Sequence, residues 1–325
     1  MYNAEETLGR LAGIPNLQVT AKALLARYTR FGIGGHCDAL VESSSAESFA
    51  AAVIALRASE APLIVIGGGT NLVVADAGFP GVVLRFTSNR LLAAGDRVSA
   101  AAGAVLDDLV DFANERGLRG IETLAGIPGW TGGAIYGNAG AYGHSISERA
   151  LTVRFFDGER VRVFDNEQCE FQYRESVFKR RKDWIVLSSE LRFDLSDAAE
   201  LRKVSEGIRG VRNAKFPPSM KCAGSIFKNF LLANLPPRAA GAVPAGVIRE
   251  GKVPAAYFLE QVGAKGLRRG GIQVADYHAN LIYNAGGGNS ADLYAVVQEL
   301  KSRVRDRFGI EAEEEVQYIG FDRVT

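Results

Sequence analysis

The glycine-rich stretch Ala125–Gly143, AGIPGWTGGAIYGNAGAYG, constrains the fold of this chain more than any other segment. It also contains Trp130, Ile135 and two tyrosines, whereas a flexible linker would be polar and repetitive. Glycine lets a backbone approach another surface closely, and successive N–H groups in such a loop can form an anion-binding concavity. The stretch is therefore typical either of backbone laid against a large ligand with phosphates or of tight turns between strands.

Length and charge narrow the class of protein. A chain of 325 residues is long enough for two or three domains. Its 38 basic and 37 acidic residues nearly cancel, which argues against partners such as nucleic acid or an anionic membrane. The first residues include acids and lack a continuous apolar core, so we expect no signal peptide. No stretch approaches the roughly 18 apolar residues of a membrane helix. We therefore expect a cytoplasmic protein with no membrane insertion.

The three cysteines and three histidines are scattered along the chain. An odd number of widely spaced cysteines predicts neither a disulfide framework nor a metal site, and it fits a reducing cytoplasm. Cys222 lies three residues before Ser225 but has no neighbouring histidine in the sequence. A buried thiol is therefore favoured over a nucleophile.

The first readable unit leads into a second glycine-rich segment. Ala39–Glu42 is strand-like, Ser44 and Glu47 have the spacing of a capping box, and a helical pattern follows. Leu63–Ile66 then reads as a buried strand that runs into Gly67-Gly68-Gly69-Thr70-Asn71. Consecutive glycines before another strand-like segment do not match the dinucleotide fingerprint, which opens a helix. The position after a buried strand favours a ligand loop, and a hairpin turn is the alternative.

Helices and strands alternate irregularly through the rest of the chain. Strands are expected at Gly81–Phe86, Val98–Ala101, 150–165, 184–193, Ile272–Val274, Ala279–Tyr283 and Val316–Phe321. Helices are expected at 105–116, Ala198–Val211, Pro254–Val262 and Ala291–Arg307, with an irregular segment at 230–253. This order predicts the α+β class in several subdomains rather than one doubly wound sheet.

Three polar residues stand where their surroundings can hold them still. Arg174, between aromatic neighbours, can clamp a carboxylate through two hydrogen bonds, or it forms a surface ion pair. Ser225 can be a positioned proton donor, or it caps a helix or turn. Glu315 ends a run of three glutamates, which is usually a solvated face, and it is the one expected to point inward. No G-x-S-x-G motif is present, which disfavours a hydrolase.

Six motifs taken together resemble one family in order and spacing. They are GGGTN (67–71), GIPGWTGGAIYGNAGAYG (126–143), YRESVFK (173–179), AGSIFKN (223–229), YHANLIYN (277–284) and EEEV (313–316). The family is that of UDP-N-acetylenolpyruvoylglucosamine reductase, flavoenzymes that make UDP-N-acetylmuramate for peptidoglycan. The resemblance runs from Tyr28 to Gly320, and six motifs in sequence make it specific.

The resemblance implies a fold and a cofactor. It implies an FAD-binding fold of the vanillyl-alcohol-oxidase type in two subdomains, 1–86 (with a returning strand 317–325) and 87–214, and an α+β substrate-binding domain, 215–316. FAD is expected as bound cofactor and NADPH as co-substrate, in a monomer that binds a UDP-sugar. The positions assigned to FAD are Gly67, Gly68, Gly69, Thr70, Asn71, Gly126, Ile127, Pro128, Gly129, Gly132, Gly133, Asn138, Gly140 and Ala141.

The resemblance also assigns the chemistry. Reducing an enolpyruvyl double bond adds a hydride to one carbon and a proton to its neighbour, while negative charge develops toward the substrate carboxylate. Arg174 and Glu315 match the residues that stabilise this charge, and Ser225 matches the proton donor. The positions assigned to substrate binding are Tyr142, Lys215, Asn229 and His278.

Some residues depart from the family pattern. The ending EEEV lacks the leucine and proline of the usual L-E-P-E-V, and Phe230 stands where proline is usual. The segment Leu191–Arg212 contains no tyrosine, which indicates the subgroup that lacks a tyrosine-bearing loop. Two alternatives stay open: another FAD oxidoreductase of this fold acting on a sugar or alcohol, or a catalytically silent protein that binds flavin or a nucleotide sugar.

Overall fold

The computed structural model describes residues 3–321, which divide into two compact units. Unit 1 comprises the described residues up to Ala23 together with Cys37–Gly69 and Pro80–Pro217, and unit 2 comprises Leu24–His36, Thr70–Phe79 and the described residues from Pro218 onward. The division into three parts at 86 and 214 stays a prediction. The predicted first and last segments, 1–86 and 317–325, include residues 1–2 and 322–325, which lie outside the described residues.

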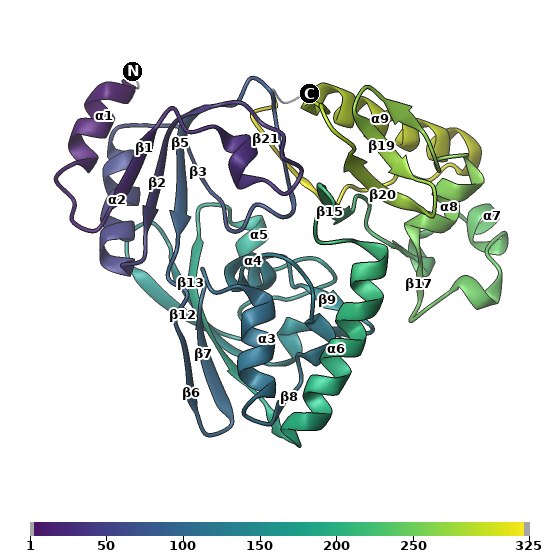
Figure 1. Cartoon of the computed structure of the whole chain (residues 1–325), viewed down its shortest axis with the longest axis horizontal. Coiled ribbons are helices and arrows are strands. Elements are labelled where there is room, and N and C mark those ends of the chain that lie inside the picture. Colours follow the sequence, from purple (N-terminus) through teal and green to yellow (C-terminus); the bar gives the residue numbers. More distant parts are fainter. Residues whose placement is uncertain (1–2, 322–325) are drawn as a thin grey trace. The chain divides into compact units, whose positions relative to one another are not determined.

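Unit 1 begins with a four-stranded sheet covered by a helix. The strands β1 (Gln18–Ala21), β2 (Cys37–Ser43), β5 (Phe79–Phe86) and β3 (Leu63–Val65) lie in the order β1-β2-β5-β3. Helix α2 (Ala46–Ala58) packs on β2, with Phe49 fully buried, and α1 (Ala4–Leu11) packs against α2 (Figure 1).

Two expectations for this sheet were wrong. The cap of α2 is Ser45, whose hydroxyl accepts the N–H of Ser48, rather than Ser44. Strand β3 is half-exposed instead of buried, because within residues 3–321 it is an edge strand whose one partner is β5.

The second sheet of unit 1 is antiparallel and five-stranded. Its order is β12 (Val161–Asp165), β11 (Ala150–Phe156), β13 (Ile185–Arg192), β7 (Arg97–Ala101) and β6 (Leu91–Ala94). The short helix α4 (Thr131–Tyr136) packs against β13 and β7. Helices α3 (Leu106–Asn114) and α6 (Ala198–Lys215) lie side by side (Figure 1), joined by hydrogen bonds from Arg209 to Asp107.

Unit 2 is built on a four-stranded antiparallel sheet. Its order is β15 (Cys222–Ser225), β20 (His278–Asn284), β19 (Ile272–Ala275) and β18 (Arg268–Arg269). Helices α8 (Ala255–Gln261) and α9 (Ser290–Phe308) pack on it (Figure 1), and α9 ends at Gly309 in the left-handed conformation that favours glycine.

A second strand pair brings the end of the chain to an early segment of unit 2. Strand β21 (Gln317–Ile319) pairs in parallel with β4 (Leu72–Val74). The carboxylate of Asp76 accepts hydrogen bonds from the N–H and hydroxyl of Ser290, so the segment after β4 is fastened to the start of α9.

Short elements complete the fold. The excursion at 230–253 is closed by pairing of β16 (Phe230–Leu231) with β17 (Lys252–Val253), and α7 (Pro237–Gly241) lies between them. The remaining short elements are β8 (Leu118–Arg119), β9 (Gly140–Ala141), β10 (His144–Ser145), α5 (Val177–Arg180), β14 (Asp194–Leu195) and the 3-10 helices Leu25–Tyr28, Glu122–Leu124, Ile146–Glu148, Leu232–Asn234 and Ala245–Val247. Helices packed on largely antiparallel sheets are the predicted α+β class. None of the helices within residues 3–321 combines the length and apolar character that a membrane crossing requires.

Candidate active site

The two glycine-rich segments contact each other in unit 1. A Cβ atom on Gly68 would lie 3.2 Å from the Cα of Gly129 and 3.2 Å from the Cδ1 of Trp130, so only glycine fits comfortably. Arg85, on β5, joins the same two segments. Its Nε donates to the carbonyl of Gly67 (3.4 Å), and its guanidinium carbon lies 4.5 Å from the centre of the Trp130 ring. Gly68 and Arg85 therefore both lie where the two segments meet.

The donors of the first segment suit a phosphate group. Within residues 3–321, the consecutive backbone N–H groups of Gly67, Gly68 and Gly69 donate to no protein acceptor. Successive backbone N–H groups of this kind form anion-binding concavities. The donor set fits the diphosphate of FAD, the cofactor that the sequence predicts.

The second segment is only partly a loop. Residues Thr131–Tyr136 form α4, which the glycine content concealed. The Thr131 hydroxyl donates to the carbonyl of Ala104 (3.0 Å), and the Gly132 N–H donates to the carbonyl of Ala102 (2.8 Å). A Cβ on Gly132 would lie 2.7 Å from that of Ala102, so close packing against the neighbouring turn requires the glycine.

Tight turns account for another part of this segment. Tyr142 and Gly143 connect β9 and β10 with φ values of 53° and 83°. Two residues with positive φ are typical of a tight hairpin turn. Tyr142, predicted to bind substrate, is 54% exposed at this turn.

Arg174 is fixed to the second glycine-rich segment. Its Nη2 donates to the carbonyl of Gly140 (2.9 Å) and its Nη1 to the carbonyl of Asn138 (3.5 Å). The Asn138 amide donates in turn to the carbonyl of Gln172 (2.9 Å). Arg174 also has a φ of 58°, a conformation that costs energy in a non-glycine residue and is found more often at functional sites. These contacts set the direction of its guanidinium group.

Ser225 ends β15 beside a bulge. Cys222 pairs with Tyr283 and Ser225 with Leu281, so β15 has one residue more than β20 over this interval. Gly224 supplies the φ of 77° within the bulge. Bulges commonly change the direction of a side chain near a functional site. Cys222 is buried, as predicted.

The backbone of Glu315 pairs with the residue that follows Ser225. The Glu315 N–H donates to the carbonyl of Ile226 (2.7 Å), and the Lys228 N–H donates to the carbonyl of Glu313 (2.9 Å). The structure therefore places the backbone that follows Ser225 beside Glu315 in unit 2. Arg174 belongs to unit 1.

The three glutamates of the final run have different surroundings. The carboxylate of Glu313 pairs with Lys228, and that of Glu314 pairs with Lys301 (2.9 Å) and accepts from Gln298 of α9 (3.2 Å). The carbonyl of Glu315 accepts the side-chain amide of Asn71 (2.9 Å). Glu313 and Glu314 are thus engaged in ion pairs, and the half-buried Glu315 stands where its backbone meets the Ser225 segment.

The residues predicted for the substrate are divided between the units. Lys215 ends α6 in unit 1, and partial desolvation, followed by the nearby Arg212 cation, lowers the pKa of its ammonium group although the residue is exposed overall. In unit 2, the Asn229 side chain accepts the N–H of Ala255 at the start of α8 (3.3 Å). His278 begins β20, and its Nδ1 lies 3.4 Å from the N–H of Asn280.

Arg85 and Asn280 were missed by sequence reasoning. Arg85 contacts both glycine-rich segments, and Asn280 contacts the backbone after Ser225. Each is a polar residue inside an apolar strand, VVLRF or HANLI. A polar residue that is buried in this way needs a partner, which is the signal that could have identified both.

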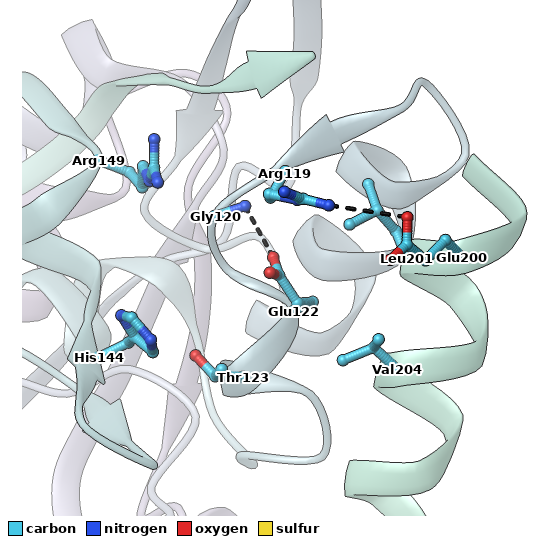
Figure 2. Close-up of a pocket in the computed structure, with 9 residues that line it drawn as sticks. All are labelled: Arg119, Gly120, Glu122, Thr123, His144, Arg149, Glu200, Leu201 and Val204. Atoms are coloured by element: carbon cyan, nitrogen blue, oxygen red, sulfur yellow. Dashed lines mark hydrogen bonds and ion pairs between the residues drawn. The ribbon is translucent and has the colours of Figure 1, made fainter. Parts of the chain in front are cut away.

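A pocket of about 290 Å³ lies elsewhere in unit 1 (Figure 2). It is lined by Arg119, Gly120, Glu122, Thr123, His144, Arg149, Glu200, Leu201 and Val204. None of the residues predicted for FAD or substrate belongs to this set. Arg119 lies 3.7 Å from Glu200, and Arg149 pairs with Asp194 at 2.7 Å. The charges are therefore balanced locally, and the pocket lacks the excess of positive charge that a diphosphate would favour.

Most of the chain is similar to known proteins. Residues 37–162 match the FAD binding domain family, and residues 216–319 match the family described as UDP-N-acetylenolpyruvoylglucosamine reductase, C-terminal domain. Over 311 residues the chain is 66% identical to a UDP-N-acetylenolpyruvoylglucosamine reductase of Solibacter usitatus, an alignment that covers 96% of this chain and 100% of the relative. Identity to the reductase of that name from Bacillus subtilis is 32%, with coverage of 94% and 95%.

A solved structure is similar over nearly the whole chain. It is the UDP-N-acetylenolpyruvylglucosamine reductase of Thermus caldophilus, with a TM-score of 0.72 and 29% identity. The match covers 93% of this chain and 98% of that one.

Proposed function

The chain belongs to the UDP-N-acetylenolpyruvoylglucosamine reductase family, and we propose that Arg174, Ser225 and Glu315 carry its reaction. It is an FAD-containing oxidoreductase that uses NADPH to reduce the enolpyruvyl group of UDP-N-acetylglucosamine enolpyruvate, giving UDP-N-acetylmuramate for peptidoglycan. Its fold joins an FAD-binding fold of the vanillyl-alcohol-oxidase type to the family's C-terminal domain. The family decides against the two alternative functions.

We propose that the two glycine-rich segments bind FAD. The N–H groups of Gly67, Gly68 and Gly69 would hold its diphosphate, and residues 126–141 would bind the rest of the cofactor. Bound FAD would supply the hydride transfer from NADPH to one carbon of the substrate double bond. Support comes from the donor set of the first segment and from its contact with Trp130.

Arg174 and Glu315 are proposed to stabilise charge on the substrate. Hydride addition to the double bond shifts an electron pair toward the substrate carboxylate. The Arg174 guanidinium, held by the carbonyls of Asn138 and Gly140, is a preorganised donor for that carboxylate. Preorganised charge and hydrogen-bond donors that meet developing charge are the strongest single contribution in many enzymes.

Ser225 is proposed to donate the proton to the second carbon. A hydroxyl is a weak acid, so it acts only when it is held within hydrogen-bond reach of the carbon that becomes negative. The single observation that carries this proposal is the pairing of the Ser225 segment with Glu315, through the 2.7 Å bond from Glu315 N–H to the Ile226 carbonyl.

Binding and assembly are also proposed. Lys215 and Asn229 would hold the diphosphate of the UDP-sugar, with Tyr142 and His278 contacting the remainder. We propose that the protein is a monomer. We infer a cytoplasmic protein, since all three cysteines are buried free thiols.

The test separates two half-reactions, which are reduction of the flavin by NADPH and reoxidation of the flavin by the UDP-enolpyruvyl sugar. Purified protein should be yellow, NADPH should bleach it without oxygen, and the UDP-enolpyruvyl sugar should restore the colour. Fast reoxidation by some other acceptor, with no response to the sugar, would overturn the proposed substrate. Replacing Arg174, Ser225 or Glu315 one at a time should slow mainly the return of colour.

A further inference from the structure

Asn280, on β20, provides hydrogen-bond partners for the backbone that follows Ser225. The bulge between Cys222 and Ser225 shifts the pairing of β15 with β20. Asn280 is only 2% exposed, although an asparagine is usually found at the surface. Its position in an apolar strand therefore calls for a specific contact.

The Asn280 side chain binds both backbone groups of one residue. Its Oδ1 accepts the N–H of Phe227 and its Nδ2 donates to the carbonyl of Phe227, each at 2.9 Å. Its own carbonyl accepts the N–H of Ile226 at 3.1 Å. The side-chain amide thus takes the place of a peptide group and continues the pairing past Ser225.

The segment Ile226–Lys228 also forms backbone hydrogen bonds with Glu313 and Glu315. The carbonyl of Ile226 accepts from Glu315, and the N–H of Lys228 donates to Glu313. The segment that follows Ser225 consequently lies between Asn280 and the backbone of Glu315. A shift at Asn280 would move Ser225 relative to Glu315.

We propose that Asn280 is a positioning residue for proton transfer from Ser225, an inference that rests on the proposed role of Ser225. Ile226 and Phe227 are at most 1% exposed. Water therefore does not readily replace an amide partner that their backbone loses. Proton transfer requires heavy atoms within hydrogen-bond reach, and a displacement of about 1 Å costs about 100-fold in rate.

Asn284 supplies a matched control. It lies four residues along the same strand, and it is 8% exposed. Its Nδ2 donates to the carbonyl of Phe31 (3.0 Å), and its Oδ1 accepts from Gly286 and Gly288 (3.0 and 2.9 Å). It is therefore a buried, hydrogen-bonded asparagine of β20, and none of its side-chain hydrogen bonds within residues 3–321 involves the Ser225 segment.

The experiment compares variants of the flavin-loaded protein by anaerobic stopped flow. Asn280→Asp keeps the acceptor for the Phe227 N–H and loses the donor, and Asn280→Ala loses both. Bleaching by NADPH should stay within about twofold of the unaltered rate. Return of colour on adding the UDP-enolpyruvyl sugar should slow about 10- to 100-fold, with a larger solvent deuterium isotope effect. Asn284→Ala should leave both rates within about twofold.

A double variant identifies the route of the effect. Residues that act through one step are not additive, so Asn280→Asp should cause no further slowing when added to Ser225→Ala. If Ser225→Ala slows the return of colour and Asn280→Asp does not, the inference about Asn280 is wrong and the role of Ser225 stands.

Equal slowing in the Asn280 and Asn284 variants would show a general loss of structure and would contradict a specific role for Asn280. A normal rate in Ser225→Ala would remove both proposals. Should Asn280→Ala fail to fold, Asn280→Asp alone decides.

Discussion

The side-chain amide of Asn71 donates a 2.9 Å hydrogen bond to the main-chain carbonyl of Glu315. The carbonyl of Asn71 accepts the N–H of Gln317 (3.0 Å), at the start of the pairing between β21 and β4. The last residue of the first glycine-rich segment is therefore bonded to the residue proposed to stabilise charge on the substrate. Within unit 2, this bond joins a residue proposed to bind FAD to a residue proposed to act on the substrate.

Replacing Asn71 by aspartate should remove that link. The variant keeps the shape of the side chain but loses the donor, so the free energy of unfolding should fall by about 1 kcal/mol, and return of colour with the UDP-sugar should slow. Urea denaturation and stopped flow measure the two effects. Asn166→Asp is the control, because its Nδ2 donates to two carbonyls of unit 1 (2.8 Å each) away from Glu315. Equal rates in the two variants would contradict the link.

Glu314→Gln should change mainly the stability of the protein, whereas Glu315→Gln should change mainly the rate of the reaction with the UDP-sugar. Glu314 pairs with Lys301, so its replacement should lower the free energy of unfolding by about 0–1 kcal/mol, with the half-reactions preserved. Glu315→Gln should slow the return of colour by about 10²–10³, with little change in bleaching. The reverse result would assign the catalytic role to Glu314.

Arg85 should contribute to retention of the cofactor. It contacts Gly67 and Trp130 and pairs with Glu42 at 2.7 Å. Arg85→Gln should therefore weaken FAD binding by about 10-fold, equivalent to about 1.4 kcal/mol. Titration of the apoprotein with FAD, followed by quenching of flavin fluorescence, measures this. Arg97→Gln removes a surface pair with Glu190 and should have no effect; equal weakening in both variants would reject a local role for Arg85.

Lys215 should make affinity for the UDP-sugar depend on pH. Its ammonium is charged below its pKa and loses charge as pH rises through it. Because that pKa is lowered from the ordinary 10.5, affinity for the diphosphate should fall at a lower pH than an exposed lysine would require. Dissociation constants from flavin absorbance changes across alkaline pH would measure the fall.

Lys215→Arg tests the cause of this pH dependence. A guanidinium stays charged throughout that pH range, so the fall in affinity should disappear. Lys265→Arg, at an ion pair with Glu260, should retain it. Persistence of the fall in Lys215→Arg would show that another group is responsible.

Sequence patterns predicted the long elements well. Helix α9 was expected at Ala291–Arg307 and spans Ser290–Phe308, because its apolar residues keep helical spacing up to a terminal glycine. Helix α4 was missed, since two glycines disfavour a helix locally. Bonds from Thr131 and Gly132 to residues 104 and 102 stabilise it, and these are tertiary contacts.

The site could be predicted only as a set of positions. Family resemblance selected Arg174, Ser225 and Glu315, whereas local pattern left each with a structural alternative. The sequence EEE does not show which glutamate is engaged elsewhere; the ion pairs of Glu313 with Lys228 and of Glu314 with Lys301 join residues far apart in the chain. The contact of Asn280 with Phe227 is of the same long-range kind.

Ser225→Ala tests the central claim most directly. The alanine variant, loaded with FAD, is reduced by NADPH without oxygen and then mixed with the UDP-enolpyruvyl sugar. Ser302→Ala, which replaces a half-buried serine of α9 that bonds Asp306, is the control. We predict bleaching at nearly the unaltered rate and a return of colour slowed by about 10²–10⁴. Equal slowing of both half-reactions, or a normal return of colour, would contradict Ser225 as the proton donor.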